Sequence, residues 1–418
     1  HRRWEDAVRG REGEPEKEEF SVQQDEADGF RVTRVIHNLT RIPDARVLYD
    51  NPFFDRVFSD LLRQEKPDLI HFQHILALSG NLVNLAKRQG YPVVLTLHDF
   101  FVLCHRIQLL KREGSLCPGP LYGLECVSCL DSASPPRDAR TRLFLRIRGR
   151  VPFPVIKWTK RFFIPPRYLC DPGYEAFHRY RYMYEILKAC DLLLTPSRFV
   201  RDFFLKYYPS LGPKMKSLSL GIPHVRGQRQ ARTAGPRTRF CYLGNVLPFK
   251  GLHVLMEAFK TLPPEKAALT IYGGRKPWHG TYEYYDELKK QGRGLCVDFP
   301  GEYQREDLPE ILKGQDIVVL PSVWPETFSL VIREANLMGL PVIASRIGAI
   351  PEAVEEGENG FLFEPDNTRE LRSLMLRFIE DPTLITKMAS RMPKVKFMEE
   401  HAMEMEEIYR GIIGSGRH

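Results

Sequence analysis

Two glutamates, Glu326 and Glu334, stand eight residues apart and could together hold a sugar. The apolar run at 317–320 predicts a buried strand, after which a turn carries Glu326 and a helix beginning near Phe328 carries Glu334. Carboxylates only accept hydrogen bonds, so they suit the vicinal hydroxyls of a sugar or a ribose. The free N–H groups at the start of that helix form an anion site suited to a diphosphate. The alternative is that both glutamates are ordinary solvated helix residues.

The residues around this pair follow a known pattern. Pro-Ser at 321–322, Gly-Leu-Pro-Val at 339–342 and Gly-Ala-Ile-Pro-Glu at 348–352 flank the two glutamates in register. This stretch of about fifty residues resembles the retaining family-4 glycosyltransferases, which have the GT-B fold. The resemblance implies that the Glu-x7-Glu pair holds a nucleotide-sugar donor and that Glu326 belongs to the catalytic group.

The resemblance also implies a clamp for the donor diphosphate. Lys250 belongs to a Lys-Gly pair that the family shares, and its ammonium at a helix N-terminus would face the leaving phosphate. Asn245 stands where the family usually has an arginine, so it can donate a hydrogen bond but brings no charge. Arg275 is the expected substitute, because it follows two strand-end glycines at 273–274.

Other donor-side positions follow from the same resemblance. The turn after the strand at 297–299 should lie near the nucleobase, which relatives read mainly through backbone groups, so the base itself is not legible. Ser329 stands where relatives often have glycine, which is tolerable if its φ is negative. The absence of an Asp-x-Asp after a strand implies catalysis without a metal. The expected donor-binding residues are Gly244, Asn245, Lys250, Gly273, Gly274, Arg275, Gly301, Glu302, Thr327, Phe328, Ser329, Leu330 and Glu334.

On the acceptor side, His98 and Asp99 follow the apolar run at 93–97, at the expected carboxyl end of a buried strand. In family-4 enzymes a histidine there meets the donor sugar near the reacting carbon. The resemblance therefore implies that His98 orients the sugar and that Asp99 orients His98 or the acceptor. Such reactions are described as front-face substitutions, in which the leaving phosphate takes the acceptor proton. A satisfied core histidine is the alternative for His98, while His71 and His74 are expected to shape the cleft.

A cysteine cluster follows directly. Four thiols within twenty-six residues end in Cys-x2-Cys and are surrounded by Gly and Pro, which is typical of a tetrahedral zinc site. The segment resembles a Cys-rich insertion, here 104–129, found in a bacterial subset of the family. Four independent thiols or two disulfides are the alternatives. The expected ligands of a structural zinc are Cys104, Cys117, Cys126 and Cys129.

Composition limits the class of protein and its partners. The chain has 418 residues, a net charge of +8 and no run of eighteen apolar residues, and its eight cysteines do not suggest a disulfide scaffold. We expect a cytoplasmic protein whose partners are acidic, such as nucleotide phosphates. Residues 137–167 mix basic and aromatic side chains, which favours peripheral contact with an anionic inner membrane face. A solvated helix is the alternative, and nucleic acid is disfavoured because no recognised module accompanies the charge.

The order of predicted elements indicates an α/β fold with two Rossmann-like parallel-sheet domains facing across a cleft. We expect an acceptor-side domain at 1–222, a linker at 223–239, a donor domain at 240–394 and a helix at 395–418 that crosses back to the first domain. Residues 1–28 look charged and strand-poor, and the expected first strand lies at 31–36, so the first domain should lack its first strand and Gly-rich loop. The other expected strands lie at 68–72, 93–97, 192–195, 240–243, 269–272, 297–299, 317–320, 342–344 and 361–363.

These features favour a retaining hexosyl-transferring enzyme that moves a sugar from a UDP-, GDP- or ADP-type donor to a saccharide or lipid-linked acceptor in surface polysaccharide or glycan synthesis. A GT-B epimerase or phosphorylase-like enzyme is the runner-up among enzymes, but the Glu-x7-Glu and Lys-Gly pairs do not favour it. A truncated or degenerate glycosyltransferase that binds nucleotide-sugar or a partner without turnover is the alternative from another class. Asn245 and the short amino-terminal domain support that alternative.

Overall fold

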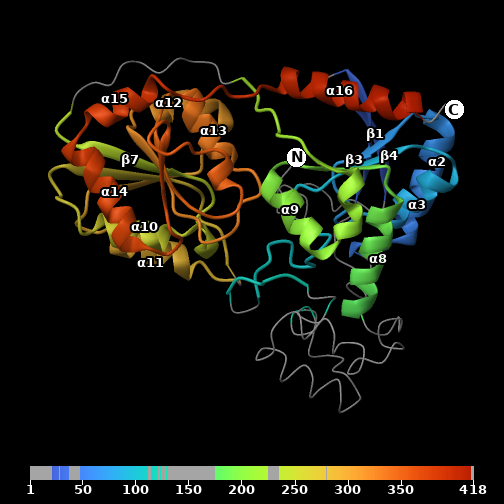
Figure 1. Cartoon of the computed structure of the whole chain (residues 1–418). Helices are drawn as coiled ribbons and strands as arrows, with labels where there is room; N and C mark the ends of the chain where they lie inside the picture. The colour runs from blue at the N-terminus through green and yellow to red at the C-terminus, as the bar shows by residue number, and fades with distance from the viewer. Residues whose placement is uncertain are drawn as a thin grey trace, which may run out of the picture.

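The chain folds as an α/β protein with two separate parallel sheets (Figure 1). The fold is known from a computed structural model. It describes residues 21–27, 29–36, 48–111, 114–120, 123, 126, 129, 175–224, 235–278 and 280–415. The basic and aromatic segment at 137–167 and most of the linker lie outside the described residues.

The second domain is built on a six-stranded sheet in the order β12-β11-β10-β7-β8-β9, with every pair parallel. The strand order reverses between β7 and β10, which are neighbours in the sheet. Ligands of open α/β sheets bind at the carboxyl ends of the strands beside such a switch point. The strands are β7 (Thr238–Leu243), β8 (Ala267–Tyr272), β9 (Val297–Gly301), β10 (Ile317–Leu320), β11 (Val342–Ser345) and β12 (Gly360–Phe363).

Helices cover both faces of this sheet, which explains its continuous apolar strands. Along β10, Ile317 and Val319 join the core cluster that includes α10, α11, α14 and α15. Val318 and Leu320 point to the opposite cluster with α12 and α13. The helical elements are η5 (Pro248–Lys250), α10 (Leu252–Phe259), α11 (Glu283–Gln291), η6 (Arg305–Asp307), α12 (Leu308–Lys313), α13 (Leu330–Leu337), η7 (Ile350–Glu352), α14 (Thr368–Glu380) and α15 (Thr383–Ala389).

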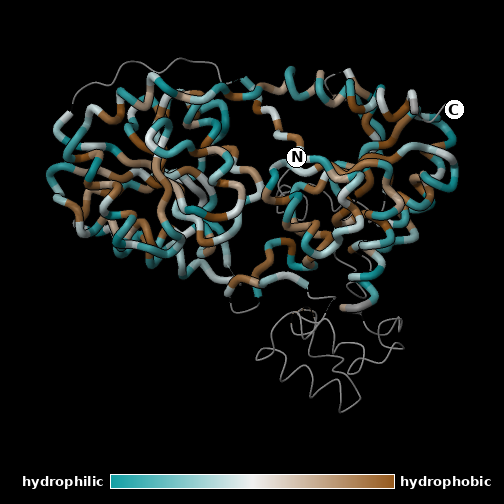
Figure 2. Tube along the Cα trace, in the orientation of Figure 1, coloured by the Kyte–Doolittle hydropathy of each residue, from teal (hydrophilic) through white to brown (hydrophobic). Residues whose placement is uncertain are grey.

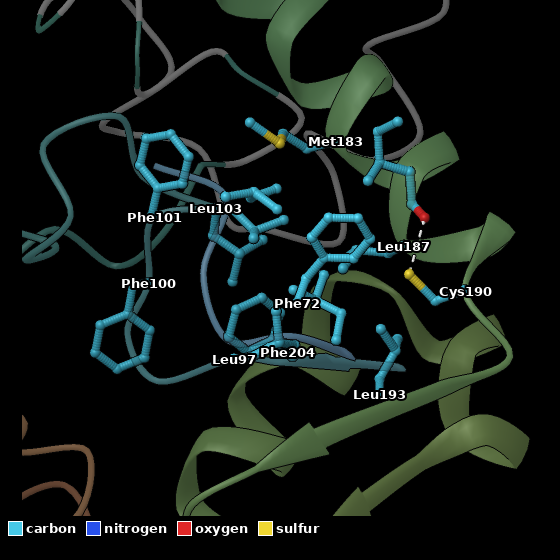
Figure 3. Packing of buried hydrophobic residues seen from close by; sticks show 14 of the residues in the cluster. Phe72, Leu97, Phe100, Phe101, Leu103, Met183, Leu187, Cys190, Leu193 and Phe204 are labelled. Atoms are coloured by element: carbon cyan, nitrogen blue, oxygen red, sulfur yellow. Dashed lines mark hydrogen bonds between the residues drawn. The ribbon is translucent and has the colours of Figure 1, made fainter. Parts of the chain in front are cut away.

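The first domain has a four-stranded parallel sheet in the order β3-β4-β5-β6. Apolar segments gather in the strands of both domains (Figure 2). Aromatic and aliphatic side chains from the strands, from α8 and from α9 fill the first-domain core (Figure 3). The strands are β3 (Ile70–Phe72), β4 (Val93–Thr96), β5 (Leu192–Thr195) and β6 (Met215–Ser217). The helical elements are α2 (Pro52–Glu65), α3 (Asn81–Arg88), α8 (Glu175–Ala189), α9 (Arg198–Tyr207) and η4 (Pro209–Lys214).

The amino-terminal strands differ from the expectation. Residues 1–28 were expected to be strand-poor, yet β1 (Val22–Ala27) pairs antiparallel with β2 (Phe30–Val35). The register joins Ala27 to Phe30 across an Asp-Gly dipeptide, and Gly29 has φ +80°. Asp-Gly is a strong signal for a two-residue hairpin turn, because that turn needs positive φ. The segment taken for the first parallel strand is therefore half of a hairpin that stands apart from the four-stranded sheet.

The last helix, α16 (Met398–Ser415), lies along the first domain (Figure 1). Met405 is buried in a cluster with Val94 of β4 and Leu194 of β5. Tyr409 packs against the same cluster. The carboxyl-terminal helix therefore covers one face of the four-stranded sheet, although most of the chain before it belongs to the second domain.

Candidate functional site

A cavity of about 340 Å³ opens at the carboxyl ends of the strands of the six-stranded sheet. Residues that follow β7, β8 and β9 form one side, and α13 forms the other. Its lining residues are Gly244, Asn245, Gly273, Gly274, Glu302, Tyr303, Gln304, Arg305, Leu308, Leu330, Val331 and Glu334. Seven of these are residues that the sequence predicted for donor binding.

Glycine backbone forms the floor at the strand ends. A Cβ at Gly273 would lie 2.0 Å from the carbonyl oxygen of Gly244, so no side chain fits between β7 and β8. The Gly244 N–H donates to the carbonyl oxygen of Tyr272 at 3.0 Å, and Asn245 follows at the mouth of the sheet. This arrangement suits an anion or a sugar that must approach the backbone closely.

Lys250 and Glu326, which are not among the lining residues, form an ion pair. The Lys250 Nζ donates to Glu326 Oε1 at 2.6 Å, and the Ser322 hydroxyl donates to the same oxygen at 2.9 Å. The Lys250 ammonium also lies 5.4 Å from the ring centroid of Trp324. Gly251 makes this close approach feasible, because a Cβ there would lie 1.7 Å from the carbonyl oxygen of Pro321. The sequence predicted that both residues bind the donor. In the fold, Lys250 follows β7 and Glu326 follows β10, and these two strands are neighbours at the switch point.

The second glutamate is buried at the cavity wall. Glu334 lies in α13, its side chain is 8% exposed, and its Oε1 lies 3.0 Å from Arg305 Nη2. Burial raises the pKa of Glu334, while the Arg305 guanidinium lowers it. An ionised carboxylate at this position can accept hydrogen bonds from two hydroxyls.

Ser329 differs from the expectation of a negative φ. Its φ is +58°, which places the residue in the left-handed region, where a non-glycine side chain is strained. The reason is local: α13 begins at Leu330 rather than near Phe328, and the chain must turn sharply into it. The Ser329 hydroxyl is buried and has no hydrogen-bond partner among the described residues.

Arg275 was expected to clamp the donor diphosphate, but in the structure it pairs with an acidic side chain outside the cavity wall. The Arg275 guanidinium bonds Asp286 at 3.0 and 2.5 Å, and it lies over the Tyr282 ring rather than in the cavity wall. Lys276, the next residue, pairs with Glu302 at 2.8 Å. The other expected donor residues that do not line the cavity are Lys250, Gly301, Thr327, Phe328 and Ser329.

Sequence reasoning missed five lining residues, namely Tyr303, Gln304, Arg305, Leu308 and Val331. Four of them belong to the turn after β9 and the start of α12. They could have been predicted from position alone, because this turn follows β9 just as Gly244 follows β7 and Gly273 follows β8. Nothing in their residue types sets them apart from solvated positions.

His98 and Asp99 lie at the end of β4, in the wall of a small cavity of about 10 Å³ in the first domain. Asp99 was expected to orient His98 or the acceptor, and its carboxylate bonds His74 Nε2 at 2.9 Å rather than His98 and accepts from the Phe101 N–H at 2.8 Å. His98 Nε2 instead lies 2.9 Å from the Gln73 amide oxygen. His74 therefore has a larger role than shaping the cleft, because it holds Asp99.

A hydrogen-bonded chain ties this corner to the carboxyl-terminal helix. His71 lies 2.7 Å from the Thr96 hydroxyl and 2.5 Å from the Tyr409 hydroxyl of α16. The Gln73 amide nitrogen is 3.2 Å from His71 Nδ1. Burial lowers the pKa of His71 to about 4, with like charge on His98 and His401 as the smaller causes. Burial likewise lowers the pKa of His98.

The two domains contact each other beside the donor turn. The Ser197 hydroxyl donates to the carbonyl oxygen of Thr327 at 2.7 Å. The Phe199 N–H, in the first turn of α9, donates to Glu352 Oε1 at 2.6 Å. The Trp324 indole N–H donates to the carbonyl oxygen of Gln108. The turn that carries Glu326 is therefore held by residues of the first domain.

The four cysteines of the expected zinc site form no disulfide. Burial raises the pKa of the Cys126 thiol, and nearby Cys104, Cys117 and Cys129 raise it further. In the part of the chain that the structure describes, no group of three or more His, Cys, Asp or Glu side chains is arranged to hold a metal ion. The zinc site stays a prediction.

Membrane contact also stays a prediction. None of the described helices is both long enough and apolar enough to span a membrane.

Comparison with known proteins agrees with this geometry. Residues 227–395 match the family model for glycosyl transferases group 1, and residues 7–117 match the model for glycosyltransferase family 4. Each domain thus resembles one of two glycosyltransferase family models, and these likenesses agree with the GT-B fold. Membership of a Cys-rich subset has no such support.

Two curated relatives match parts of the chain. One is the sulfoquinovosyl transferase SQD2 of Arabidopsis thaliana, 28% identical over 205 residues, which are 45% of this chain and 38% of the relative. The other is the D-inositol 3-phosphate glycosyltransferase of Corynebacterium efficiens, 35% identical over 128 residues, which are 29% of this chain and 30% of the relative. The chain thus spans well under half the length of these relatives.

Solved structures show the same fold over a longer stretch. Sucrose-phosphate synthase from Thermosynechococcus elongatus superposes with a TM-score of 0.63 at 20% identity, covering 96% of this chain and 87% of that one. Anabaena Alr3699/HepE in complex with UDP and glucose superposes with a TM-score of 0.55 at 19% identity, covering 85% and 80%. At these identities the likeness supports the fold alone.

Proposed function

We propose that this chain is a retaining glycosyltransferase that moves a hexosyl group from a nucleotide-sugar donor to a saccharide or lipid-linked acceptor. The observation that carries the proposal is the cavity at the switch point of the six-stranded sheet. Its lining supplies a glycine floor and one buried carboxylate, and the segments that follow β7 and β10 at the same switch point supply a lysine–carboxylate pair. These groups are suited to bind the diphosphate, the transferred sugar and the ribose of such a donor.

Each group has a chemical task in this proposal. Glu334 accepts the ribose hydroxyls, and Glu326 accepts hydroxyls of the transferred sugar. Lys250 places its ammonium beside the diphosphate as negative charge develops on the leaving group, which lowers the barrier electrostatically. The bare amides at the start of α13 and the Ser329 hydroxyl supply further donors, so this proposed reaction needs no divalent metal.

His98 is proposed to orient the sugar from the first domain. Its ring is fixed by the Gln73 amide oxygen, which accepts from the Nε2–H tautomer at 2.9 Å. The second nitrogen, Nδ1, then stays unprotonated and accepts a hydrogen bond. The pKa of His98 is lowered by burial, so the ring is neutral at pH 7 and can accept from a sugar hydroxyl. Asp99 supports the same corner through His74 rather than through His98.

A binding protein without turnover is the second candidate, favoured by one observation. The arginine that the family uses in its diphosphate clamp is Asn245 here, and the expected substitute Arg275 is paired with Asp286. Donor binding without transfer or hydrolysis would support this reading.

Donor binding is tested by thermal shift with UDP, GDP and ADP and their glucose or mannose conjugates, because a ligand of the folded state raises the melting temperature. We expect a shift with one nucleotide family that is lost in Glu326→Gln and in Lys250→Met. Lys394→Met, which removes a lysine from an exposed ion pair with Glu400, is the matched control. No shift for the folded wild type with any nucleotide would overturn the proposal. Release of free sugar from the bound donor would separate the enzyme from the binding protein.

A further inference from the structure

Glu334 and Arg305 both line the cavity and form an ion pair with each other. Among the described residues, Arg305 is the one cation within ion-pair distance of Glu334, at 3.0 Å, and Glu334 is the one carboxylate within that distance of Arg305. The carboxylate is 8% exposed and the guanidinium 34%. A carboxylate at this depth loses most of its hydration, so its ionised form depends on the cation beside it.

The position of Arg305 is fixed by its own short element. Arg305 begins η6, whose capping box joins the Gln304 N–H to Asp307 Oδ2 at 2.8 Å. Leu308 follows directly and is buried in the same cluster as Ile332 of α13. The turn that carries the guanidinium is therefore packed against the helix that carries the carboxylate, which keeps the two side chains opposite each other.

The ion pair is incompletely satisfied in the ligand-free protein. Arg305 Nε and Nη2 are buried and have no hydrogen-bond partner among the described residues, although Nη2 is close to Glu334. The pair therefore holds by charge rather than by an aligned hydrogen bond, and the carboxylate keeps acceptor capacity for a ligand. Unsatisfied buried donors of this kind are uncommon and call for an explanation.

We propose that Arg305 is a positioning residue for Glu334: it keeps the Glu334 carboxylate ionised and turned toward the cavity, where that carboxylate accepts the hydroxyls of the donor's nucleoside sugar. This inference rests on the proposed function, because it assumes that the cavity takes a nucleotide-sugar. The inference adds that ribose recognition depends on the positive charge of Arg305, which lies in the turn after β9.

Other charged groups near the cavity do not substitute for Arg305. Glu302 lines the cavity and pairs with Lys276 at 2.8 Å. Arg333, the neighbour of Glu334 in α13, donates to the carbonyl oxygens of Phe328 and Ser329. Burial raises the pKa of Glu334 and Arg305 opposes that effect, so loss of the guanidinium would raise this pKa further.

The test is donor affinity as a function of pH. The probe is whichever of UDP-glucose, ADP-glucose and GDP-mannose stabilises the wild type most, since these diphosphate diesters do not themselves titrate between pH 5.5 and 8.5. In Arg305→Met we expect affinity to fall as the pH is lowered and to recover as it is raised, because loss of the guanidinium raises the pKa of Glu334 further and moves the whole profile toward higher pH. Arg305→Lys should restore the wild-type profile, since it keeps the charge.

A double-mutant cycle separates positioning from direct contact with the ligand. Glu334→Gln should weaken binding at every pH, and adding Arg305→Met to it should cost little more, because the arginine acts through the glutamate. Equal losses at all pH values in Arg305→Met, additive with Glu334→Gln, would overturn the inference. Arg391→Met, which breaks the ion pair with Glu358, is the control and should bind like the wild type.

Failure of the inference is distinguishable from failure of the proposed function. A folded wild type that binds none of the three probes contradicts the proposed function. A wild type that binds one of them, with an Arg305→Met variant whose pH profile is unchanged, contradicts only the role of Arg305. Circular dichroism and melting temperature of each variant exclude loss of fold as the cause.

Discussion

Glu352 of the second domain binds the amino terminus of helix α9 in the first domain, where its Oε1 accepts from the Phe199 N–H at 2.6 Å. Its other oxygen accepts from the Arg198 N–H at 3.0 Å. The first N–H groups of a helix lack internal partners and carry the positive end of its dipole, so a carboxylate is favoured there. The contact lies beside the Ser197–Thr327 bond, and the two together hold the donor turn against the first domain.

The first prediction concerns this contact. Glu352→Gln keeps the acceptor oxygen and removes the charge, and we expect it to lower the free energy of unfolding by about 0.3–1 kcal/mol, the usual effect of a charge at a helix end. Urea denaturation at low and high salt measures the effect, which should shrink with salt. Glu358→Gln, in an exposed pair with Arg391, is the control and should have little effect. An unchanged stability in both variants would contradict the role of Glu352.

The second prediction concerns the strained turn before α13. Ser329→Gly should raise the free energy of unfolding by about 1 kcal/mol, because glycine adopts a φ of +58° without a clash. The same change removes the buried hydroxyl, so donor affinity should fall although the protein is more stable. Thermal melts and donor titrations on one preparation measure both effects. A variant that is less stable would show that the hydroxyl stabilises the free protein.

The third prediction is a loss of stability in acid. Burial lowers the pKa of His71 to about 4 and that of His105 to about 3, whereas an unfolded histidine titrates near 6.5. Between these values the unfolded chain binds more protons than the folded one, so stability falls as the pH drops below 6.5 and stops falling near pH 3–4. Unfolding free energies from pH 7 to pH 4 should show this slope.

A single substitution isolates the contribution of His71. His71→Gln keeps polar contacts to Thr96 and Tyr409 within reach but cannot titrate. The slope of stability against pH should then be smaller by about one proton. An identical slope in the variant would mean that His71 is protonated in the folded state.

The fourth prediction concerns the cysteines. Protein purified without added metal should contain about one zinc per chain if the four thiols form a tetrahedral site. Cys126→Ser should abolish the zinc content and lower the melting temperature, whereas Cys296→Ser, an exposed thiol outside the cluster, should do neither. Elemental analysis of both variants measures this. A metal-free wild type that keeps its melting temperature in chelator would leave the cysteines as ordinary thiols.

The central strands of both parallel sheets could be predicted from the sequence because they are buried on both faces. Ile317–Leu320 of the second domain and Leu192–Thr195 of the first have the bounds that their apolar runs indicated. β6 and β1 were missed, since β6 has little apolar signal and β1 is largely exposed, whereas β2 was expected as a strand at 31–36 but not as half of a hairpin. Strands exposed on both sides lack the alternation of apolar and polar residues from which a strand is predicted.

The α/β class, the spacing of Glu326 and Glu334 and the lysine at the donor turn could be read from the sequence, because strand–turn–helix order and helical spacing are local properties of the chain. Which charges meet could be seen only in the folded protein: Lys250 with Glu326, Arg305 with Glu334, and His74 rather than His98 with Asp99. These pairs join residues between 25 and 76 positions apart. Their contact depends on how strands and turns stack in space, which no local pattern encodes.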